Sequence, residues 1–98
     1  MDHASNVVLD AIDFTPETLQ GARIFGDEDH RIGQVTHVHG MGPESKVVVE
    51  VGGFLGIGAK SVQMDTRDMT FMRDDDGKVH GLTSLTKAQV HALPEHRH

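Results

Sequence analysis

The strongest strand signal in this sequence is the run Lys46-Val47-Val48-Val49-Glu50-Val51, whose β-branched residues favour extended backbone. Turn-forming residues precede it at positions 40–45. Four glycines interrupt the chain directly after it, in residues 52–58. We therefore expect residues 46–51 to form a central strand, and we expect the glycines to form a sharp turn with positive φ angles.

Similar short runs lie on both sides of this segment, and they alternate apolar with polar residues. Strands are predicted at residues 22–25, 31–39, 60–64, 68–72 and 78–82. A tight turn is expected at Asp74-Asp75-Asp76-Gly77. One helical turn is predicted after Thr15, and a helix of about two turns is predicted between Thr86 and Pro94. Several short strands with glycine-rich turns indicate an all-β barrel or sandwich rather than a βαβ fold.

Composition limits what the chain can be. Its 98 residues suffice for a single domain, and the 37% of hydrophobic residues support a modest core. The formal charge of −6, with Lys and Arg scattered singly, argues against direct nucleic-acid binding. Cysteine is absent, and there is no apolar run long enough to span a bilayer. We expect a soluble, cytoplasmic protein that does not insert into membranes.

The beginning of the chain differs from the rest in charge. Residues 1–20 hold four acidic residues and no Lys or Arg. Because this segment has no sustained periodicity, residues 1–18 are predicted to be a flexible arm, and residues 1–9 are predicted to be dispensable for folding. The domain itself is expected over residues 19–94, with a tail at 95–98.

Three segments resemble the PRC-barrel family, named for the H subunit of the photosynthetic reaction centre. They are Gly21-Ala22-Arg23-Ile24-Phe25, Arg31-Ile32-Gly33-Gln34-Val35 after an acidic turn, and residues 47–60, which are the most specific. The family commonly has glycine where His30 stands and proline near Asp65, so the chain departs at both points. The resemblance implies a small, strongly bent antiparallel barrel used for protein contacts, without enzymatic activity or cofactor.

No catalytic constellation is visible in the sequence. Residues 53–61 nearly match the phosphate-binding P-loop, but Ala59 is one residue too many and a strand pattern follows instead of a helix. If Gly77 were the glycine of a calcium loop, the closing glutamate position would fall on Thr83. No spacing ties a serine to a particular histidine and acid. We therefore predict that the chain is not an enzyme.

Two histidines suggest a different kind of site. His37 and His39 are two residues apart, so on a strand they point the same way and can share one Zn²⁺ or Ni²⁺. A third ligand is not evident nearby. Val35 and Val38 cannot both be buried by strict alternation, which predicts a bulge here that would spoil the shared face. A histidine-based metal carrier or sensor is the alternative function.

The leading hypothesis is a protein-interaction or assembly module that binds a protein partner or a second copy of itself, as in a homodimer. Exposed strand edges and the glycine loop are the expected contacts. Within that loop, Phe54 is predicted to fold inward, whereas Leu55 and Ile57 are predicted to be available to a partner or a second copy.

Overall fold

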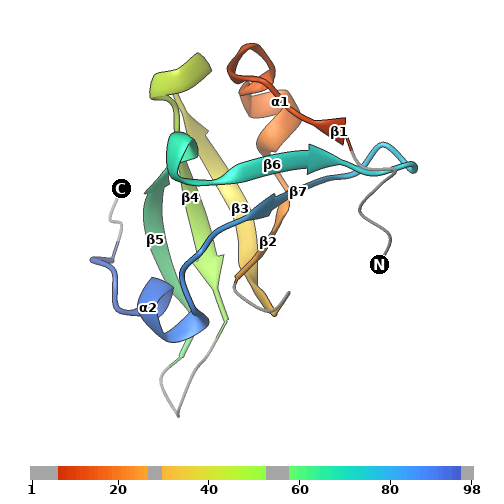
Figure 1. Cartoon of the computed structure of the whole chain (residues 1–98). Coiled ribbons are helices and arrows are strands. Elements are labelled where there is room, and N and C mark those ends of the chain that lie inside the picture. The colour runs from red at the N-terminus through yellow and green to blue at the C-terminus, as the bar shows by residue number, and fades with distance from the viewer. Residues whose placement is uncertain (1–6, 27–29, 53–57, 96–98) are drawn as a thin grey trace.

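The computed structural model describes residues 7–26, 30–52 and 58–95, and within them the chain is mainly β (Figure 1). This confirms the predicted fold class at that level. The strands are β1 (Val7–Val8), β2 (Arg23–Phe25), β3 (Arg31–His39), β4 (Lys46–Val51), β5 (Lys60–Asp65), β6 (Thr70–Arg73) and β7 (Val79–Leu82). The helices are α1 (Pro16–Leu19), α2 (Lys87–His91) and the 3-10 turns η2 (Ala11–Asp13), η4 (Gly42–Glu44) and η5 (Thr66–Asp68).

The strands of the described residues form one sheet in the order β1-β6-β7-β2-β3-β4-β5. Consecutive strands from β2 to β5 pair antiparallel wherever they are neighbours, and so do β6 and β7. β2 and β7, however, pair in parallel, with Arg23 opposite His80. The expectation of a purely antiparallel sheet is therefore wrong. The sheet is mixed because β7 returns from far along the chain to the free side of β2.

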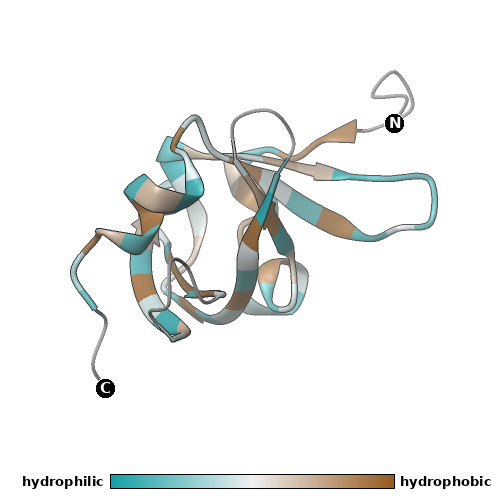
Figure 2. Cartoon of the chain, turned by 90° about the horizontal axis from the view of Figure 1, so that it is seen from below, coloured by the Kyte–Doolittle hydropathy of each residue, from teal (hydrophilic) through white to brown (hydrophobic). Residues whose placement is uncertain are grey.

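The sheet bends strongly, so that β6 and β7 cross over β3 and β4 (Figure 1). The bend encloses a single apolar core. Figure 2 shows hydrophobic and hydrophilic residues alternating along the strands. The core joins strands from both halves of the sheet and both α-helices. Its fully buried members include Leu19, Ile24, Val35, Val47, Val49, Val51, Val62, Phe71 and Val90. No pairing joins β1 to β5 within the described residues, so the sheet keeps two edges.

Local sequence signals explain how the helices begin. The Thr15 side chain caps α1 by accepting a hydrogen bond from the Thr18 amide at 3.3 Å, and Pro16 stands at the first helical position. At α2, Thr86 accepts from the Gln89 amide at 3.1 Å, and the Gln89 side chain accepts from the Thr86 amide at 2.9 Å. This reciprocal pair is the predicted capping box.

The segment expected to be an arm makes contacts with the sheet from Val7 onward. Val7 and Val8 pair antiparallel with Arg73 and Met72 of β6. Leu9 donates a backbone hydrogen bond to the Phe71 carbonyl at 2.8 Å, and its side chain is buried in the core. The apolar run at residues 7–9 thus belongs to the domain, because one edge of β6 accepts it as a short strand. Residues 1–6 lie outside the described part of the chain.

No helix within the described ranges has the length and apolar character needed to cross a membrane.

Candidate functional site

The three loop residues chosen from the sequence, Phe54, Leu55 and Ile57, fall within residues 53–57 and so lie outside the described residues. Their inward and outward placement therefore stays a prediction. On either side of these residues, Gly52 follows β4, and Gly58 and Ala59 precede Lys60, the first residue of β5.

The lysine of the P-loop-like motif, Lys60, makes a structural contact within the fold. Lys60 is the first residue of strand β5, so a strand follows the glycines, as predicted. Its ammonium group donates a hydrogen bond to the His91 carbonyl at the end of α2, at 2.7 Å. The lysine thereby holds the C-terminal helix against the sheet.

The bulge predicted near the histidine pair is present in β3. The β3–β4 register pairs Val35 with Val49 and then His37 with Val48, so Thr36 is the additional residue. Both Val35 and Val38 are buried as a result. The bulge precedes His37, however, and His37 and His39 still share the outer face. The expectation that the bulge spoils this face is wrong, because its single extra residue lies before the pair.

The two imidazoles lie close together on that face. Their ring centroids are 4.6 Å apart and the ring planes are inclined by 64°. Both side chains are exposed. Among the described residues, no group of three or more histidines or acids is arranged to hold a metal ion. The pair could therefore supply two ligands, and further ligands would come from elsewhere.

Among the described residues, large apolar side chains are exposed elsewhere, on segments near the N-terminus and before β4. They are Val7, Val8, Ile12 and Met41, with exposed fractions of 64%, 60%, 84% and 69%. We call these four residues the apolar surface. They belong to β1, η2 and the residue that precedes η4, and these segments lie at the upper end of the molecule in Figure 1.

Backbone hydrogen bonds fix the segments that carry the apolar surface. The Gly42 amide donates to the Phe14 carbonyl at 3.0 Å and joins η4 to the residue that follows η2. Phe14 is buried and packs edge-on against Phe71, with ring centroids 5.6 Å apart. Sequence reasoning missed this surface because Ile12 and Met41 stand in irregular segments. The only signal was that these large apolar residues had no periodic partners.

The two edges of the sheet differ in how they are covered. Beyond β5, Glu95 makes a β-bridge with Val62, and α2 contacts β5 as well. β1 pairs with β6 on one side, and no described residue pairs with its other side. Among the described residues, the edge at β1 is therefore the less covered one, and it carries two of the four exposed apolar residues.

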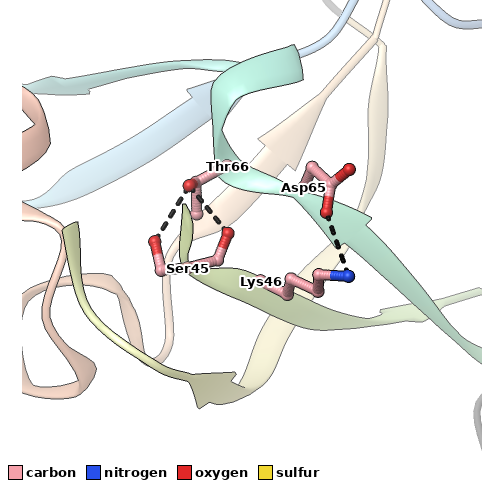
Figure 3. A network of polar contacts seen from close by, with 4 residues as sticks. All are labelled: Ser45, Lys46, Asp65 and Thr66. Carbon is pink, nitrogen blue, oxygen red and sulfur yellow. Dashed lines mark hydrogen bonds and ion pairs between the residues drawn. The ribbon is translucent and has the colours of Figure 1, made fainter. Parts of the chain in front are cut away.

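A network of polar contacts connects the start of β4 with the end of β5 (Figure 3). The Ser45 hydroxyl donates to the Gly42 carbonyl at 2.7 Å and lies 2.9 Å from the Thr66 hydroxyl, which donates to the Ser45 carbonyl at 2.9 Å. Both residues are buried. The hydroxyls serve to hold η4 and η5 together. Beside them, Lys46 and Asp65 form an ion pair at 3.8 Å.

Comparison with known protein families finds no family model that matches the chain, and comparison with curated proteins finds no match.

Proposed function

We propose that this chain is a non-enzymatic protein-interaction module acting in the cytoplasm, and that its bent sheet is a PRC-type barrel. The barrel assignment is supported by the similarity of residues 47–60 to that family and by the strong bend that encloses one core. The absence of cysteine is compatible with a reducing compartment.

One observation carries the proposal of an interaction module. The open edge of the sheet at β1 coincides with large apolar side chains that stay exposed, namely Val7 and Val8. An open edge offers backbone donors and acceptors to another strand. Covering exposed apolar surface with a partner stabilises the complex by about 25 cal/mol for each Å² buried. The two features together are typical of a surface that binds another chain by strand addition.

We propose a second copy of this chain as the occupant. β1 strands from two copies can pair antiparallel around a two-fold axis, which brings the same residues of both copies together, as in an isologous interface. Each copy carries a formal charge of −6, so the copies repel each other weakly. Salt screens this repulsion. Association should therefore strengthen as the salt concentration rises.

Sedimentation equilibrium over a wide range of protein and salt concentrations tests this proposal. The wild-type chain should form dimers, and Val8→Asp and Ile12→Asp should weaken dimer formation while leaving the melting temperature nearly unchanged. Ala59→Asp adds the same charge at an exposed position away from the apolar surface and is the matched control. A wild-type chain that stays monomeric at all concentrations would contradict self-association, and so would equal effects of all three substitutions.

A metal carrier or sensor is the second candidate function, because the His37 and His39 rings lie within 4.6 Å of each other on an exposed strand face. Calorimetric titration with Zn²⁺ and Ni²⁺ tests it. Binding should be lost in His37→Ala and kept in His30→Ala, another exposed histidine. Heat of binding that does not change in His37→Ala would rule out this pair as the site.

A further inference from the structure

A pocket of about 500 Å³ lies on the outer face of the sheet, at the point where β2 and β7 pair in parallel. Its lining comes from the segment before β2, from β2 itself, from Gln34 of β3, and from the β6–β7 turn with the start of β7. Its size falls within the range of small-molecule sites. It shares no lining residue with the apolar surface.

His80 is the unusual residue of this pocket. Its partners across the sheet are Arg23 on β2 and Met72 on β6. The next residue, Gly81, faces the core against Phe71 and Ile24, so His80 points to the other face. The imidazole is only 7% exposed, and its Nε2 is buried without a hydrogen-bond partner in the described part of the chain. Buried polar atoms in folded proteins almost always have a partner, so this nitrogen is an exception among the described side chains, and it marks the floor of the pocket as a place where burial is not balanced by a hydrogen bond.

The charged side chains that line the pocket can pair with an anion. Two cations line it, Arg23 and Lys78, and neither forms an ion pair with another described residue. Asp74 is the one acid among the lining residues, and its Oδ1 already accepts hydrogen bonds from the amides of Asp76 and Lys78, both at 2.9 Å. Two cations against one acid leave the lining positive, although the chain as a whole carries −6.

One wall of the pocket is apolar. The half-buried Phe25 ring stands edge-on to His80, with centroids 6.0 Å apart, and Val79 and Ala22 also line the cavity. A hydrated inorganic anion would leave these side chains without contacts. A carboxylate attached to an apolar body would fill both parts of the pocket, because its charge can meet Arg23 and Lys78 while its body covers Phe25.

We propose that this pocket binds a small carboxylic acid with an apolar body. The carboxylate accepts hydrogen bonds from the Arg23 guanidinium and the Lys78 ammonium, and the apolar body lies on Phe25 beside the His80 ring. Arg23 is the principal determinant, because its planar guanidinium can donate two parallel hydrogen bonds to one carboxylate.

Nuclear magnetic resonance titration of the full chain with benzoate tests this proposal. Benzoate should shift the ring signal of His80 and the backbone amide signals of Arg23 and Lys78 in a saturable manner. Benzamide, which has the same shape without the charge, should bind much more weakly. Arg23→Gln should weaken benzoate binding about tenfold, as expected for a lost hydrogen bond to a charged group. Arg67→Gln removes the same charge at an exposed position away from the pocket and should have no effect.

Three results would overturn the assignment. Benzoate could produce no saturable shift at these residues, or benzamide could bind as tightly as benzoate, which would remove the role of the charge. Inorganic phosphate could bind at these residues while benzoate does not, and this result would show that the apolar wall does not contribute to binding. Both arginines are exposed, so their replacement should leave the fold intact. The amide spectrum of each variant verifies this before the titration is interpreted.

Discussion

The Thr66 hydroxyl and the Thr66 amide both donate to the same acceptor, the Ser45 carbonyl, at 2.9 and 3.2 Å. This double contact joins the start of β4 to the turn after β5, and both residues are almost completely buried. The turn η5 therefore begins at Thr66 because its first residue is held by the neighbouring segment.

Replacing Thr66 by Val should destabilise the fold. The substitution keeps the shape of the side chain but leaves the Ser45 carbonyl with one hydrogen bond fewer in a buried place. We expect the free energy of unfolding to fall by about 1–3 kcal/mol. Urea denaturation measures the change. The same substitution at the exposed Thr70 is the control and should alter the value by at most about 0.5 kcal/mol. Equal effects at both positions would show that the contact with Ser45 contributes nothing.

Gly33 should tolerate no side chain. A Cβ atom at this position of β3 would overlap the Glu50 backbone carbonyl oxygen on β4, and backbone cannot move aside as a side chain can. Gly33→Ala should therefore lower the free energy of unfolding by about 3 kcal/mol, the upper end for overpacking. Gly58→Ala is the matched control, because a Cβ there meets no atom within 4 Å. It should leave stability unchanged or slightly raised. A folded Gly33→Ala variant with wild-type stability would contradict the close approach of these two strands.

Much of the secondary structure could be predicted because its signals are local. Residues 31–39 and 46–51 are strands with the predicted bounds, since alternating or continuous β-branched residues end at glycine or serine turns. The strand predicted at 68–72 begins instead at Thr70, since Thr66 is held by Ser45 and the turn η5 extends to Asp68. That contact joins residues 21 positions apart and leaves no local pattern.

The pairings between distant segments could not be predicted in the same way. In the parallel pairing of β2 with β7, Arg23 lies opposite His80. The sequences of these two short strands contain no signal that predicts this pairing. The same reason applies to the candidate sites. The bulge before His37 was predictable from two valines, whereas the exposure of Ile12 and the burial of His80 depend on which distant segments pack beside them.

The fold should not depend on a bound metal ion. Its core is built from aliphatic, methionine and phenylalanine side chains, and no described group of three histidines or acids is placed to hold an ion. Hydrophobic burial supplies the stability of such a core. Addition of EDTA should therefore leave the melting temperature unchanged, as measured by circular dichroism. A fall of several degrees would instead assign a structural role to a metal, and His37→Ala would then be expected to reproduce that fall without chelator.

Leu9 should contribute to stability although it lies in the segment that the sequence suggests is dispensable. Its side chain is 8% exposed within the core cluster, and its amide donates to the Phe71 carbonyl at 2.8 Å. Leu9→Ala would leave a cavity at the margin of the core and should lower the free energy of unfolding by about 2–3 kcal/mol. Val8→Ala, one residue earlier and 60% exposed, should change it by about 0.5 kcal/mol or less. Urea denaturation of both variants, performed at a protein concentration low enough to exclude dimers, separates the two positions. If Leu9→Ala were as stable as Val8→Ala, the docking of residues 7–9 on β6 would not contribute to folding, and residues 1–9 would be dispensable, as the sequence predicts.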